Sequence, residues 1–206
     1  IGVARQYFGF HSGVDQVMEA ALEDLQRLGA VLVDPVKLPA DADYGENELT
    51  VLLYELKAGL AAYLATLGPG ARVRTLDDII RFNEDFADRE MPYFGQELFL
   101  RAQPLGPLSD YAYRKARKQN LRLLRERGLD DVMRRHQLDA IVGPTGGPAW
   151  TTDLVNGDHY GGGCSSPAAV AGYPHITVPA GDVHGLPVGL SFFGRAWSEP
   201  VLLGLA

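Results

Sequence analysis

The sequence predicts an α/β fold in which strands near the two ends of the chain flank a helical middle. Three observations carry this prediction. Short apolar runs with strand character lie before residue 35 and after residue 137. Between them, apolar residues recur at helical spacing, and a region rich in Gly and Pro spans 143–174. Strands and helices distributed in this way pack as layers around a shared core.

The N-terminal segment reads as a β-α-β unit. Residues 1–5 are an apolar run typical of a strand. Ser12, with Asp15 three residues on, is the expected N-cap of the helix that follows, whose apolar residues recur on one face. Gly29 supplies a left-handed helix end. Residues 30–33 are then expected to form a buried strand.

The middle of the chain is expected to be helical throughout. Thr75 and Asp78 have the spacing of a capping box, which marks a helix start. Gly68 and Gly70, on either side of Pro69, end the apolar periodicity of the preceding segment. Helices are therefore expected over about 47–67, from Thr75 to Pro92, over 91–103 and over 110–127.

Strand character returns in the C-terminal part of the chain. Apolar, β-branched and aromatic residues recur over 138–142, 175–178 and 188–193. The residues between the first two of these runs are expected to form a loop. Ser198, followed by Glu and Pro, is expected to start a last helix.

Composition narrows the class of protein. With 206 residues, 46% of them hydrophobic, the chain can bury a core, and its apolar runs are shorter than the roughly 20 residues of a membrane span. A single cysteine and the absence of a charged-then-apolar leader favour a cytoplasmic protein. The net charge of -7 argues against a nucleic-acid partner. The exception is 109–136, with nine Lys or Arg against four acids, which indicates a solvated helix face or a surface that contacts RNA or an anionic partner.

The region rich in Gly contains three groups that could in principle act as nucleophiles, Cys164, Ser165 and Ser166. A nucleophile needs a base within hydrogen-bond reach, and only His159 or His175 could serve. No G-x-S-x-G pattern surrounds them. We therefore expect a structural or ligand-contacting loop. The five histidines are scattered, so no metal site is expected.

Five segments carry family-like motifs in order along nearly the whole chain: 1–39, 75–83, 90–97, 138–145 and 161–181, the last reading GGGCSSPAAVAGYPHITVPAG. Together they resemble the amidase-signature family, whose members hydrolyse or transfer carboxamides. The resemblance implies part of an α/β/α sandwich around a mixed sheet. It also implies that residues 1–206 are the C-terminal portion of one amidase-signature domain, truncated at both ends.

The family's chemistry uses a Ser nucleophile, a second Ser held by a cis peptide, and a neutral buried Lys. These belong to a Gly- and Ser-rich stretch and an upstream Lys that this sequence does not contain. None of the lysines of this sequence, at 37, 57, 115 and 118, occupies the position of the family's catalytic Lys. The resemblance therefore implies no catalytic residue, metal or organic cofactor here, and an inactive chain when separated from the N-terminal half. The implied partners are that half and a small-molecule amide substrate.

The resemblance also implies that the C-terminal half of such enzymes lines the substrate pocket. The candidate substrate-binding residues are Gln96, Arg101, Asp158 and Ser165. Two other functions stay open at this point: a standalone binding or adaptor domain that uses the basic helix 110–127, and an amidotransferase component that acts on misacylated tRNA. Uncovered strand edges leave homo-oligomer formation open as well.

Overall fold

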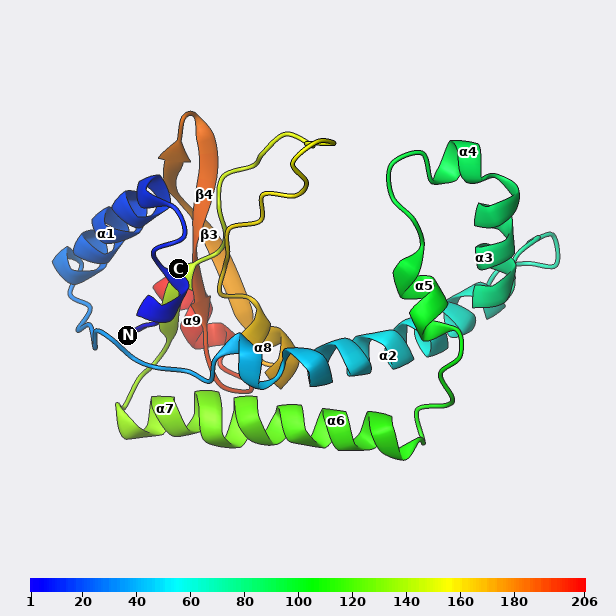
Figure 1. Ribbon diagram of the computed structural model, residues 1–206. Coiled ribbons are helices and arrows are strands. Elements are labelled where there is room, and N and C mark those ends of the chain that lie inside the picture. The colour runs from blue at the N-terminus through cyan, green and yellow to red at the C-terminus, as the bar shows by residue number, and fades with distance from the viewer. The chain divides into compact units, whose positions relative to one another are not determined.

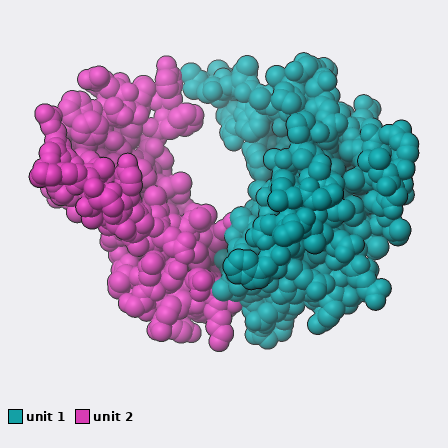
Figure 2. Space-filling view, turned by 180° about the vertical axis from the view of Figure 1, so that it is seen from behind, with its two compact units in different colours: residues 1–43, 120–206 teal, residues 44–119 magenta.

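The computed structural model describes all 206 residues, and the chain divides into two compact units (Figures 1 and 2). Unit 1 consists of residues 1–43 and 120–206, and unit 2 of residues 44–119. All strands belong to unit 1, whereas unit 2 contains helices only. The predicted class, an α/β fold with a helical middle segment, is confirmed.

Unit 1 is built on a mixed sheet of four strands in the order β1-β2-β4-β3. β1 runs parallel to β2, and β4 is antiparallel to both of its neighbours. β3 and β4 form a hairpin with an irregularity between Pro179 and Gly181, and both strands are longer than the sequence predicted. The strands are β1 (Gly2–Val3), β2 (Ile141–Pro144), β3 (His175–Val183) and β4 (Leu186–Phe193).

One face of this sheet is covered by α1 (Ser12–Arg27), with α9 (Glu199–Leu205) joining the same apolar core. Alternation along β4 places Val188, Leu190 and Phe192 in that core. The intervening residues, including Ser191, point to the opposite face. The sheet therefore has an apolar face against α1 and a second face that carries hydroxyl groups.

The start of α1 differs from the sequence prediction, because His11 is the N-cap in place of Ser12. The His11 imidazole Nδ1 accepts hydrogen bonds from the backbone N–H groups of Gly13, at 3.1 Å, and Val14, at 3.4 Å. Asp15 accepts instead from the backbone of Gly9, outside the helix. An imidazole nitrogen does here what a Ser hydroxyl does in the usual cap. The left-handed end at Gly29 is confirmed by its φ of 102°.

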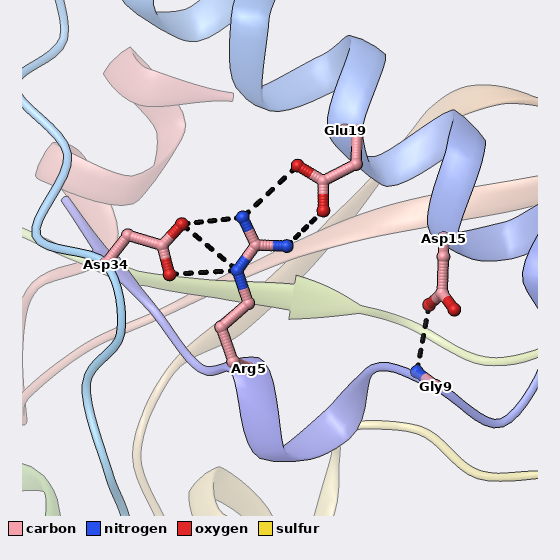
Figure 3. A network of polar contacts seen from close by, with 5 residues as sticks. All are labelled: Arg5, Gly9, Asp15, Glu19 and Asp34. Atoms are coloured by element: carbon pink, nitrogen blue, oxygen red, sulfur yellow. Dashed lines mark hydrogen bonds and ion pairs between the residues drawn. The ribbon is translucent and has the colours of Figure 1, made fainter.

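Arg5 ties three segments of unit 1 together (Figure 3). Its Nε donates to Asp34 Oδ1 at 2.8 Å, and its guanidinium also contacts Glu19 on α1. The two carboxylates raise the pKa of Arg5 further above its ordinary value. The expected buried strand at 30–33 is wrong, since only Val33 bridges to β1 and Val31 is 79% exposed. This segment lies at the edge of the sheet, where side chains meet solvent.

Unit 2 packs its helices around Leu53, Leu76, Ile80 and Ala102. The capping box is confirmed: Asp78 N–H donates to the Thr75 hydroxyl, and Thr75 N–H donates to the Asp78 carboxylate. The helix expected over 91–103 begins only at Glu97, and a break at residue 86 divides the one expected before it. The helices are α2 (Gly45–Ala65), α3 (Leu76–Asp85), α4 (Ala87–Glu90) and α5 (Glu97–Ala102).

The basic helix is longer than predicted, and its helix type changes along its length. α6 (Tyr111–Leu121) continues into the π-helical η3 (Arg122–Leu129) and then α7 (Asp130–Arg135). The break lies at Gly128, with φ -100° and ψ -107°, where a Cβ atom would be 2.9 Å from the carbonyl oxygen of Leu123. Two short 3-10 turns, η1 (Arg5–Tyr7) and η2 (Asp41–Asp43), complete the elements outside the loop region.

Among the helices, none combines the length and the apolar character that crossing a bilayer requires.

Candidate functional site

Three hydroxyl groups meet on the sheet face opposite α1. Thr145 Oγ1 lies 2.5 Å from Thr177 Oγ1 and 2.7 Å from Ser191 Oγ. Ser191 is fully buried, whereas Thr177 is exposed. Gly189 makes this meeting possible, because a Cβ atom there would lie 2.5 Å from the Thr177 hydroxyl. The hydroxyl cluster, Thr145, Thr177 and Ser191, thus leads from the interior of unit 1 to its surface.

Cys164 lies beside this cluster, against Gly143 of β2. The thiol is fully buried, and this burial raises its pKa to about 11, although a hydrogen bond with Ser191 acts in the opposite direction. A thiol with a raised pKa is protonated at neutral pH and is a poor nucleophile. Cys164 therefore serves as a small buried apolar group under the loop.

The two histidines that could have acted as bases are engaged elsewhere. His175 packs on Phe193, with ring centroids 5.7 Å apart, and its Nε2 is buried without a hydrogen-bond partner. Burial lowers its pKa. His159 Nε2 lies 3.4 Å from Asp153 Oδ2. Neither ring forms a hydrogen bond with Cys164, Ser165 or Ser166. At these positions, therefore, no nucleophile is paired with a general base.

The loop between β2 and β3 is ordered around Asp153. Its carboxylate accepts from the backbone N–H groups of Val155 and Asn156, both at 2.8 Å, and from the Asn156 side chain at 2.9 Å. These donors hold the pKa of Asp153 well below its ordinary value. Gly157 follows with a φ of 87°, which a side chain would strain. A self-contained turn therefore supports the residues after it.

Asp158, one of the predicted binding residues, follows this turn directly. Its Oδ1 accepts from Trp150 Nε1 at 2.8 Å, and the Trp150 ring lies 6.4 Å from that of Tyr160, tilted by 55°. All three side chains are exposed. Beneath them, Phe10 packs so closely on Gly161 that a Cβ atom there would lie 2.8 Å from its ring. Asp158 is thus held at the surface beside two aromatic rings.

Ser165 lies at the end of the same loop, directly before α8 (Ser166–Ala171). Its side chain is exposed and caps no backbone group, so its hydroxyl is available to a ligand. The expectation of a continuous loop over 143–174 is wrong here. The sequence signal for this helix was the alanine-rich run after Pro167, followed by Gly172. Pro is favoured in the first turn of a helix, and Gly172, at φ 67°, provides the left-handed helix end.

α8 is fastened to η3 by a small polar network. Arg125 Nε donates to the carbonyl oxygen of Ala171, and the guanidinium lies 5.1 Å from the centroid of the Tyr173 ring. The Tyr173 hydroxyl donates in turn to Asp130, at 2.9 Å. The basic segment thus uses part of its charge inside unit 1.

The other two predicted binding residues belong to unit 2. Gln96 Oε1 accepts from Asn83 Nδ2 at 3.1 Å, and Gln96 Nε2 donates to the carbonyl oxygen of Ile80 at 3.2 Å. Gln96 also lines an open hollow of about 320 Å³, together with Met91 and Phe94. Arg101, in the last turn of α5, is exposed, does not line this hollow, and forms no ion pair.

Asp158 and Ser165 therefore belong to unit 1, and Gln96 and Arg101 belong to unit 2. Sequence reasoning missed Trp150, Tyr160 and the hydroxyl cluster. Trp150 and Tyr160 could have been found from the sequence, because they are aromatic residues in a loop that is otherwise rich in Gly and polar residues. No group of three or more His, Cys, Asp or Glu side chains lies together in a way that could hold a metal ion.

Comparisons with known proteins agree on one family. A sequence profile described as Amidase matches residues 1–203. The chain is similar to the peptide amidase PAM, solved with the competitive inhibitor chymostatin, at 45% identity and a TM-score of 0.92, over 100% of this chain and 41% of that one. It is 33% identical to an Arabidopsis thaliana protein described as a probable amidase, over 92% of this chain and 35% of that protein. A component of the glutamyl-tRNA(Gln) amidotransferase of Exiguobacterium sibiricum is 31% identical, over 98% of this chain and 42% of that protein.

The chain thus spans 35 to 42% of the length of these relatives. The mixed sheet, the helices around it and the order of the elements match the solved structure along the whole chain. The profile match covers nearly every residue that builds the two units described above. This chain belongs to the Amidase family.

Proposed function

We propose that the protein containing this chain hydrolyses the carboxamide C–N bond of peptide-like amides. The observation that carries the proposal is the similarity to a peptide amidase, which extends over the whole chain with nearly half of the residues identical. A TM-score of 0.92 over the whole chain supports a shared backbone in this segment. The reaction takes up one water and releases ammonia and a carboxylate.

The residues of this chain act in binding and orientation under this proposal. Because burial raises the pKa of Cys164 and neither candidate histidine contacts a serine of the loop, we assign the nucleophile and its base to residues outside the chain. The family's Ser-Ser-Lys mechanism supplies them: one Ser attacks the carbonyl carbon, and its proton passes through the second Ser to the Lys. Asp158 and Ser165, exposed on a loop that its own hydrogen bonds order, are the groups we assign to substrate binding.

Gln96 and Arg101 take different parts in this proposal. The amide of Gln96 is bonded at both ends within unit 2, so it shapes the hollow that it lines. Arg101 keeps a free guanidinium, which suits it to contact an anionic group of a ligand or of the remainder of the protein.

An amidotransferase function is the alternative, in which ammonia released from an amide passes to an acceptor on tRNA. The similarity to the amidotransferase component is lower, at 31% identity, although it covers as much of the chain. The basic segment 109–136 would offer its charge to such a partner. Several of these cations are already engaged, however, with Arg125 bonded to Ala171 and both Arg134 and Arg135 paired to Asp131.

The test uses the full-length protein and a measurement of released ammonia. We expect hydrolysis of N-acetylated amino acid amides without any added protein or tRNA. The 206-residue chain alone is the matched control, and we expect no turnover from it, because loss of a catalytic nucleophile costs about a millionfold in rate. Turnover that requires glutamyl-tRNA would instead support the amidotransferase. Turnover by the isolated chain, abolished by Ser165→Ala, would overturn the assignment of the nucleophile to a segment outside it.

A further inference from the structure

The exposed corner formed by Trp150, Asp158 and Tyr160 has features that folding alone does not require. Trp150 is 45% exposed and Tyr160 is 64% exposed, and both lie in the loop between β2 and α8. They are held by a hydrogen bond from the indole to a carboxylate and by the contact between the rings. Preformed exposed aromatic groups of this kind are typical of binding surfaces.

Contacts order the chain before and after the corner. On one side, Asp153 organises the turn at residues 153–157 through three hydrogen bonds to Val155 and Asn156. On the other, Phe10 packs beneath Gly161 and Gly162, where added Cβ atoms would lie 2.8 and 3.0 Å from its ring. A binding group that is already ordered loses less conformational entropy when a ligand arrives.

The charge of Asp158 has no cationic partner. Its Oδ1 is bonded to the neutral indole of Trp150, its Oδ2 makes no hydrogen bond, and it forms no ion pair. The loop and α8, residues 143–174, contain no Lys or Arg at all. The nearby His159 is paired with Asp153 instead. The corner therefore presents one uncompensated negative charge together with two exposed aromatic rings.

We propose that this corner binds the cationic side chain of a peptide amide, such as that of a Lys or Arg residue. Aromatic faces attract cations through the ring quadrupole, and a carboxylate adds a charge-assisted hydrogen bond. An apolar side chain placed here would instead bury the Asp158 carboxylate without compensation. The inference rests on the proposed peptide amidase function for its substrate class and deepens it, since it assigns a side-chain preference.

The experiment compares Nα-acetyl-argininamide with Nα-acetyl-citrullinamide, which has nearly the same shape without the charge. In the full-length protein we expect kcat/KM to favour the arginine compound by about five- to tenfold, the range of a partly exposed cation site. Asp158→Asn keeps an oxygen for the Trp150 indole and removes only the charge, so the ratio should fall close to one. Trp150→Phe keeps a ring and loses the hydrogen bond, and should reduce the ratio less.

Asp182→Asn is the matched control. Asp182 is also exposed, also belongs to unit 1, and its carboxylate bonds a single backbone group, the N–H of Gly185 in the β3–β4 turn. It removes the same net charge, so an unchanged ratio in this variant excludes a general effect of protein charge. A ratio that Asp158→Asn leaves unchanged, or an equal loss of turnover for both substrates, would overturn the proposal.

Failure of the proposed function gives a different result. If the full-length protein hydrolyses neither amide, isothermal titration of the two compounds still decides the inference. Tighter binding of the arginine compound by wild type, lost in Asp158→Asn and kept in Asp182→Asn, would support the cation site without the amidase reaction. Equal binding of the two compounds by wild type would overturn it.

Discussion

Gln96 in unit 2 and Asp158 in unit 1 were both predicted to bind substrate, yet their side chains differ in burial and in hydrogen bonding. The side-chain amide of Gln96 is half-buried and bonded at both ends, to Asn83 and to the carbonyl of Ile80. The carboxylate of Asp158 is exposed, with one oxygen free. A polar side chain can serve a ligand only with the hydrogen-bonding capacity that its own fold leaves unused. By this criterion Asp158 is the better candidate for a binding residue.

The largest loss of stability should come from a substitution that disturbs the packing of the sheet in unit 1. Gly189→Ala would place a methyl group 2.5 Å from the Thr177 hydroxyl and 2.9 Å from that of Thr145. We expect the free energy of unfolding to fall by about 1 to 3 kcal/mol, as in other overpacked sites. Urea denaturation followed by circular dichroism measures it.

The matched control for this substitution lies in unit 2. Gly59 is in the middle of α2, and an added Cβ atom would meet nothing within 4 Å. Gly59→Ala should therefore stabilise the protein by about 0.5 to 1 kcal/mol through helix propensity. A destabilisation of similar size in both variants would contradict the packing explanation for Gly189.

The next prediction tests the comparison of Gln96 with Asp158 directly. Gln96→Ala leaves the Asn83 amide and the Ile80 carbonyl without their partner, and should lower the free energy of unfolding by about 1 to 2 kcal/mol. Asp158→Ala should change it by less than about 0.5 kcal/mol, as surface substitutions do. Thermal unfolding of the two variants side by side provides the measurement. Equal losses would show that Asp158 is as structural as Gln96.

Helix starts in the two units extend the comparison, because Thr75 caps α3 in the expected way and His11 caps α1 in an unexpected one. His11→Ala should cost about 1 kcal/mol of stability, the usual cost of a lost N-cap. His11→Asn supplies another acceptor at the same position and should retain most of it. Denaturant midpoints of the two variants will show whether the acceptor matters; identical losses would mean that the ring contributes by packing.

The smallest effect should be the response of the turn at Asp153 to low pH. Because its pKa is lowered in the folded protein, the stabilisation that the carboxylate provides is complete above the ordinary carboxyl pKa of about 4. It is lost as the pH falls through the lowered value. Hydrogen exchange at the backbone amides of Val155 and Asn156 should therefore stay protected at pH 5 and weaken only in stronger acid.

Asp153→Asn should weaken this protection already at pH 7, since it replaces a charged acceptor by a neutral one. The exchange of α1 amides in unit 1 serves as the internal reference and should not change. Protection that is independent of both pH and substitution would show that Phe10 and the backbone alone order the loop.

Much of the fold was available from the sequence, because it depends on neighbours along the chain. Helical spacing predicted the helices of unit 2, and the Thr75 to Asp78 pattern located a helix start to the residue. Gly29 ended α1 as expected. The resemblance to the family likewise rested on short ordered motifs, and the profile match bears it out. Propensity and capping act over a few residues, so they can be read without knowledge of the fold.

The remaining features depend on contacts that the sequence does not bring together. Thr145 meets Thr177 and Ser191 across separations of 32 and 46 residues, and only the sheet register determines that they face one another. Val31 is apolar but lies at a sheet edge, which made the buried strand prediction wrong. The sequence by itself determined the α/β class, the family and the helical middle. The tertiary structure decided which polar groups form hydrogen bonds within the fold and which, like one oxygen of Asp158, form none, because hydrogen-bond partners must be close in space.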